Sequence, residues 1–64
     1  MHGGAGVNGE VRALRVYFHH RPPSTVMGFV DVVNGVVCYE YVISEDRKGL
    51  GYIPLSSIIE VKEV

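Results

Sequence analysis

The sequence predicts an all-β protein, a small barrel of five strands with a one-turn helix before the last strand. From residue 11 onward, apolar and polar residues alternate with a period of two, as expected for strands. β-Branched and aromatic residues dominate these runs, and clusters of Gly, Pro, Asn and Ser separate them. The 64 residues suffice for one domain, expected over residues 11–64 after a flexible glycine-rich tail at residues 1–10.

The first three strands have the clearest signals. The first is expected over residues 11–18, where Leu14, Val16 and Phe18 share one face. The runs 26–33 and 36–43 flank an Asn-Gly pair, which predicts a hairpin closed by a type I′ turn. A glycine within the second run, Gly28, indicates a bend in that strand.

The last third of the chain has weaker signals. Residues 44–51 are polar and contain two glycines, which predicts a loop. A short fourth strand is expected at residues 52–54, ended by Pro54 because proline has no N–H to donate to a neighbouring strand. A single helical turn then follows at residues 54–57, and the fifth strand occupies residues 58–64.

The segments GFVDVVNGVVCYEYVI (28–43) and GYIPLSSIIEV (51–61) resemble the strand pattern of small SH3-like barrels. The pattern is similar to that of Sm-like proteins and of PRC-barrel domains, and the resemblance covers residues 11–64. Likeness to Sm-like proteins implies RNA binding. Likeness to PRC-barrels implies a non-catalytic module for protein assembly or for RNA-processing factors.

Charge and hydropathy bound the partners. The formal net charge is -1, and residues 1–32 carry +1 against -2 for residues 33–64, so the total charge gives no sign of a polyanion-binding protein. The apolar runs are shorter than the roughly 18–20 residues that a membrane span needs. A cytoplasmic protein without a membrane partner is therefore expected.

Two adjacent histidines, His19 and His20, precede Arg21 and two prolines. Adjacent side chains of an extended segment point to opposite sides, and further ligands at a metal-binding spacing are lacking. Two interpretations remain for residues 18–25: a connecting loop stiffened by its prolines, or a loop in which His19, His20 and Arg21 contact a partner.

Catalysis is not expected. Cys38 is the only cysteine, and Glu40 two residues later would disfavour its thiolate. Ser56 and Ser57 lie in the expected helical turn, where hydroxyls usually bond to local backbone. The sequence therefore predicts no enzyme, no metal site and no cofactor.

Four aromatic residues on neighbouring strands have two interpretations. These residues are Tyr17, Phe29, Tyr39 and Tyr41. In one interpretation they fill the core of a small barrel, and in the other they form a stacking platform for bases or a peptide groove.

The end of the chain, residues 52–64, is the expected oligomer edge. Apolar residues occur on both faces of this segment, and its charged residues protect the edge only in part. The candidate edge residues are Tyr52, Ile58, Ile59 and Val61. The predicted function is a non-enzymatic binding and assembly module that forms a homo-oligomer and contacts a further protein. The alternative is an Sm-like binder of RNA or single-stranded nucleic acid.

Overall fold

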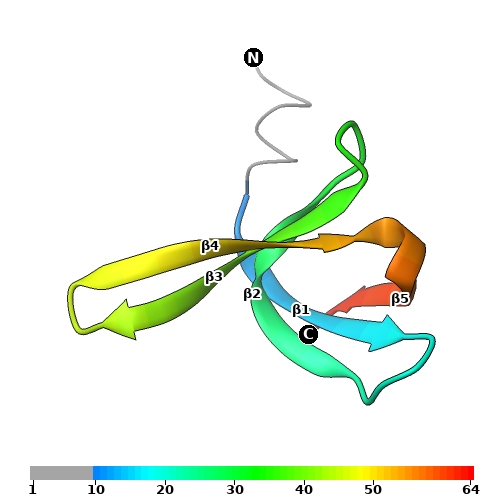
Figure 1. Cartoon of the computed structure of the whole chain (residues 1–64), viewed down its shortest axis with the longest axis horizontal. Helices are drawn as coiled ribbons and strands as arrows, with labels where there is room; N and C mark the ends of the chain where they lie inside the picture. Colours follow the sequence, from blue (N-terminus) through cyan, green and yellow to red (C-terminus); the bar gives the residue numbers. More distant parts are fainter. Residues whose placement is uncertain (1–9) are drawn as a thin grey trace.

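A computed structural model describes residues 10–64 as one antiparallel sheet of five strands with a short 3-10 helix (Figure 1). The elements are β1 (Arg12–Phe18), β2 (Ser24–Asp31), β3 (Val36–Ser44), β4 (Arg47–Pro54), η1 (Leu55–Ser57) and β5 (Ile58–Glu63). The all-β class, the five strands and the helical turn before the last strand are thus confirmed. The predicted tail, apart from Glu10, lies outside the described residues.

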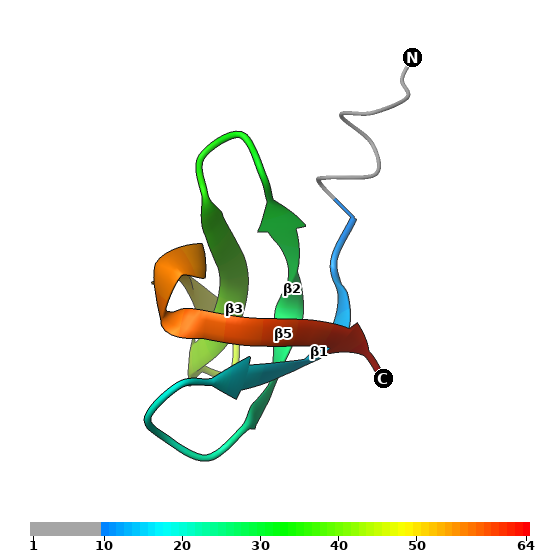
Figure 2. The ribbon, with the colours of Figure 1, turned by 90° about the vertical axis from the view of Figure 1, so that its right-hand side faces the viewer.

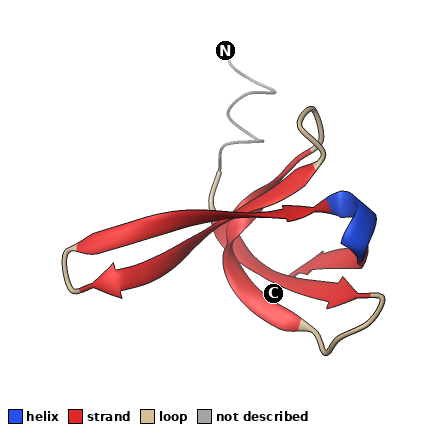
Figure 3. Cartoon of the chain, viewed as in Figure 1, coloured by secondary structure: helices blue, strands red, loops and turns tan. Residues whose placement is uncertain are grey.

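The sheet is not closed into a barrel, which corrects the predicted architecture. Its strand order is β4-β3-β2-β1-β5, so β4 and β5 form the two edges. The strands curl around a concave side, and η1 carries the chain from one edge to the other (Figures 2 and 3). Backbone contacts anchor this crossing, since Leu55 N donates to Gly35 O at 2.9 Å and His19 N donates to Ser57 O at 3.4 Å. The turn bridges the edges without a β4–β5 ladder among the described residues.

The core lies on the concave side. Five residues with buried side chains form it: Leu14, Val16, Phe18, Val37 and Ile53. The expected face of β1 is therefore confirmed, and the cross-strand pairs Val30↔Val37 and Val37↔Ile53 extend this face over β2, β3 and β4. Each fully buried side chain of this size contributes roughly 1.5–3 kcal/mol, so a core this small leaves a narrow stability margin.

The predicted β2–β3 hairpin is confirmed, but its turn type is not. Asp31 pairs with Val36 across a four-residue connection, and Gly35 is the only residue between 10 and 64 with positive φ, at 69°. A type I′ turn would also require positive φ at Asn34. Instead, the Asp31 carboxylate accepts hydrogen bonds from Asn34 Nδ2 at 2.7 Å and from Asn34 N at 3.1 Å. These bonds favour the charged form and lower the pKa of Asp31.

The fourth strand is longer than predicted, because residues 47–51 of the expected loop belong to β4. Ser44 pairs with Arg47 around a tight turn, and the β3–β4 ribbon projects from the sheet as an arm (Figure 1). Tyr39 lies opposite Gly51, and Tyr41 lies opposite Gly49 in the same way. The tyrosine rings occupy the space beside these glycines. Glycine is a poor strand residue, but an aromatic partner compensates for its missing side chain.

The β1–β5 ladder contains a bulge that changes the expected faces of β5. Val61 pairs with Val16 and Ile58 with Phe18, so Ile59 is the additional residue where the register shifts. Ile58 and Val61 therefore both pack against the core, whereas Ile59 is exposed. The period-two alternation expected for the last strand is therefore interrupted at Ile59.

Among residues 10–64, the structure contains no helix with the length and apolar character of a membrane-spanning segment.

Candidate binding site on the concave face

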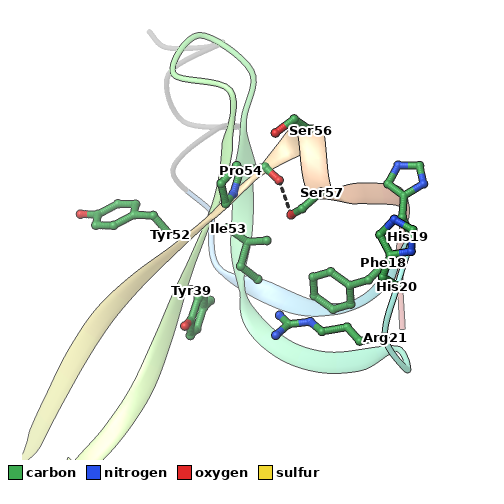
Figure 4. Close-up of a pocket in the computed structure, with 10 residues that line it drawn as sticks. All are labelled: Phe18, His19, His20, Arg21, Tyr39, Tyr52, Ile53, Pro54, Ser56 and Ser57. Atoms are coloured by element: carbon green, nitrogen blue, oxygen red, sulfur yellow. Dashed lines mark hydrogen bonds between the residues drawn. The ribbon is translucent and has the colours of Figure 1, made fainter.

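A hollow of about 620 Å³ opens where η1, the β1–β2 loop and the β3–β4 ribbon meet (Figure 4). We call it the concave cavity. Ten residues line it: Phe18, His19, His20, Arg21, Tyr39, Tyr52, Ile53, Pro54, Ser56 and Ser57. Its volume lies within the roughly 300–1,000 Å³ of typical ligand sites.

The concave cavity has an apolar floor and a polar rim. Phe18 and Ile53 are buried core residues, and Tyr39 is half-buried beside them. The other seven lining residues are exposed. Ser57 Oγ donates to the carbonyl of Pro54 at 2.9 Å, which holds the helical turn that forms one wall.

Arg21 is positioned by an aromatic ring. Its guanidinium carbon lies 4.0 Å from the centroid of the Phe18 ring, a cation–π contact that links the rim to the floor. Within the described part of the chain, Arg21 makes no ion pair. The charge of this guanidinium is thus available to a ligand.

The rim carries three basic side chains and no carboxylate of the described residues. His19, His20 and Arg21 line the concave cavity, and no Asp or Glu of residues 10–64 does. Arg21 carries the formal positive charge of the lining, the two imidazoles add hydrogen-bonding groups, and a positive charge attracts ligands of the opposite sign. The rim therefore favours an anionic group over a cationic one.

The two histidines lie next to each other, with ring centroids 6.1 Å apart and ring planes at 43°. The described residues contain no group of three or more His, Cys, Asp or Glu side chains that could hold a metal ion. The side chains that line the concave cavity offer ionic attraction, hydrogen bonding and apolar contact.

A second hollow, of about 350 Å³, lies on the opposite side of the β3–β4 ribbon and has the opposite character. Phe29, Leu50 and Tyr52 contribute apolar surface there, and Asp31 and Glu40 contribute carboxylates. Cys38 is buried in its wall.

The structure divides the four predicted aromatics between two faces. Tyr39 and Tyr41 lie together on the concave face, with ring centroids 6.3 Å apart. Phe29 pairs with Cys38 and faces the other side of the sheet. Tyr17 also alternates away from the buried face of β1, and Lys62 Nζ lies 5.8 Å from the centroid of its ring.

The predicted edge residues also divide. Tyr52 is 63% exposed on β4, and Ile59 is 61% exposed at the bulge in β5. Ile58 and Val61 are half-buried against the core. Only Tyr52 and Ile59 of this set offer substantial surface to a partner.

Several lining residues had no functional signal in the sequence. In the sequence, Phe18 belongs to the apolar face of the first strand, Ile53 to a short strand, and Pro54 and Ser56 to a turn. Their shared position follows from the crossing of η1, which brings the turn to the β1–β2 loop. Recognising that both connections lie at one end of the sheet is the signal that would have found them.

Comparison with known proteins finds no family model that matches the chain, and no match among curated proteins or solved structures.

Proposed function

We propose that this chain is a non-enzymatic binding and assembly module that forms a homo-oligomer through the free edge of β4. The strand order and the one-turn helix before β5 support the finer interpretation that the sheet is an opened SH3-like barrel. An open sheet has two edges whose backbone N–H and C=O groups can pair with another chain.

The edge of β4 is the observation that carries this proposal. Within residues 10–64, β4 pairs with β3 alone, and its segment 49–53 contains no charged residue. Leu50 and Tyr52 point to the same face of this strand and are 57% and 63% exposed. An exposed strand edge with an uncharged, partly apolar segment is a template for strand pairing.

The edge of β5 is less suited to pairing. The bulge at Ile59 twists the strand, and three charged residues follow it in the sequence: Glu60, Lys62 and Glu63. Bulges and charges are the devices by which natural sheets protect their edges. The interface proposed from the structure therefore centres on β4 rather than on residues 58–64.

A two-fold arrangement satisfies the chemistry of this edge. Antiparallel pairing of β4 with a second copy, centred on Leu50, places Leu50 opposite its own copy. It also places Lys48 opposite Tyr52 of the other copy, so that like charges do not oppose each other. This is the self-complementary contact that a two-fold dimer requires.

Size-exclusion chromatography with light scattering between about 1 and 300 μM tests the proposal, because weak dimers associate in this range. We expect the wild-type mass to approach twice that of one chain at the upper end. Leu50→Lys should run as a folded monomer. The matched control Val32→Lys, in the exposed β2–β3 connection, should dimerise as the wild type does. A wild-type monomer at about 100 μM would refute the proposal.

Binding of single-stranded nucleic acid remains the second candidate function. The adjacent Tyr39 and Tyr41 rings on the face of the concave cavity support it, because bases stack on exposed aromatics. Ion pairing weakens it, since three of the six Lys and Arg residues contact carboxylates: Arg12, Lys48 and Lys62. Nucleic acid that co-purifies, seen in the 260/280 nm absorbance ratio and released by salt, would favour this candidate.

A further inference from the structure

We infer that the concave cavity binds an extended segment of a partner protein in which acidic side chains stand beside an aromatic or large aliphatic one. Three residues at the end of β4 line this site, but Leu50, the centre of the proposed strand pairing, does not, so a substitution at Leu50 can remove self-association and leave the lining unchanged.

The rim selects the acidic component. His19, His20 and Arg21 follow one another in a single loop, and carboxylates of the described residues are absent from the lining. Arg21 offers a planar fork of N–H donors that matches a carboxylate, and its stack on Phe18 restricts its motion. Figure 4 shows its guanidinium beside the Phe18 ring, directed toward the side of the hollow where Tyr39 lies. A carboxylate bound there meets a donor that is already positioned.

The floor selects the apolar component. Phe18 and Ile53 lie at the base of the hollow, and the half-buried ring of Tyr39 forms a wall. An aromatic or aliphatic side chain that enters loses water-exposed apolar surface, as do these three residues. The ligand therefore needs an apolar group within one or two residues of its carboxylate.

The open rim favours a peptide over a small molecule. Sites for small ligands usually enclose 70–90% of the ligand surface, whereas seven of the ten lining residues here are exposed. A chain segment can cross the concave cavity with its backbone polar groups facing water and the exposed hydroxyl of Ser56. Acidic peptide side chains also suit the isolated cationic rim better than a phosphate backbone, which needs several cations along its path.

Fluorescence anisotropy with the full chain tests this inference. The probe is a fluorescein-labelled ten-residue peptide in which Glu alternates with Phe and Val. One control peptide has Lys at every Glu position, a second has Ser at every Phe and Val position, and a third probe is labelled decathymidine. We expect only the first peptide to bind with a measurable Kd, and its Kd to rise as salt is increased from about 50 to 300 mM.

Two loop variants and a matched control locate the site. Arg21→Glu should raise the Kd of the acidic peptide at least tenfold, and His20→Glu should raise it several-fold. Arg15→Glu makes the same charge change at an exposed arginine outside the concave cavity and should leave Kd within twofold of wild type. Circular dichroism spectra of the variants should match that of the wild type, because all three side chains are exposed.

Equal binding of the acidic and lysine peptides, or tighter binding of decathymidine, would overturn the inference. An equal loss in Arg15→Glu and Arg21→Glu would also overturn it, because the effect would then come from net charge alone. Leu50→Lys distinguishes peptide binding from the proposed dimerisation. This variant should be monomeric and should still bind the acidic peptide. Absence of peptide binding in a chain that dimerises would reject this inference alone.

Discussion

Gly28→Ala should destabilise the protein more than any other single methyl addition to its glycine-containing strands. A Cβ atom at Gly28 would collide with the carbonyl oxygen of Cys38 and would lie 2.8 Å from the Cα of Tyr39. Both obstacles are backbone atoms of β3, which pairs with Gly28 in the ladder. The collision can therefore be relieved only if the two strands separate.

The expected cost follows from this geometry. Forcing an extra methyl group into a packed site typically costs about 1–3 kcal/mol, and backbone obstacles place Gly28→Ala near the upper end. A domain of this size has a total stability of about 3–8 kcal/mol. A loss of about 2–3 kcal/mol should lower Tm by roughly 10–20 °C, and Gly28→Val should leave little folded protein at room temperature.

Gly49→Ala is the matched control. A Cβ atom there would meet only the ring of Tyr41, an exposed side chain that can rotate away. We expect a loss below about 1 kcal/mol, reduced further because alanine restricts the unfolded chain. Thermal and urea unfolding followed by circular dichroism measure both variants. Equal Tm values for Gly28→Ala and Gly49→Ala would refute the conclusion that β2 and β3 approach closely at Gly28.

Three further outcomes test other parts of the structure. Replacing His19 and His20 together by alanine should leave the circular dichroism spectrum and the metal content of untagged protein unchanged; stoichiometric zinc lost in this variant would contradict that. Val61 packs against the core, so Val61→Lys should already be unfolded at the start of a urea titration. Ile59 is exposed, so Ile59→Lys should change the free energy of unfolding by less than about 0.5 kcal/mol. Asp31 has a lowered pKa in the folded state, so its contribution to stability is complete above its unfolded pKa of about 4 and is lost as pH falls through the folded pKa. Asp31→Ala should therefore be less stable at pH 7 and lose less stability between about pH 5 and pH 2 than the wild type, measured by urea unfolding at each pH.

The sequence was most informative where the signal is local. Alternation in residues 11–18 identified the buried face of β1, and Asn34-Gly35 identified the hairpin because few other sequences turn there readily. The turn type was wrong because the carboxylate of Asp31 binds Asn34 and stabilises a longer connection. A single dipeptide carries no information about that competing bond.

The features that the sequence did not predict depend on contacts between strands. β4 is stabilised as a strand by Tyr39 and Tyr41 of β3, which cover its glycines, so residues 47–51 alone resemble a loop. The open sheet and the bulge at Ile59 depend on how β5 meets β1, which period-two patterning does not specify. The same is true of the concave cavity: the basic loop was a candidate contact surface, but its apolar floor comes from the packing of the core.

The β3–β4 ribbon, finally, joins two regions of unequal cooperativity. At its base, Val37 is fully buried and shares the global unfolding of the core, while residues 41–48 are all exposed and contact the rest of the sheet weakly (Figure 1). A two-stranded ribbon alone is marginally stable in water, so the outer amides should exchange with solvent through local opening, at a free energy well below that of the base. A chain that paired with β4 would add a third strand to this ribbon. Binding would then slow amide exchange in the arm first. The least stable part of the free protein would thus gain the most protection from exchange when a partner binds.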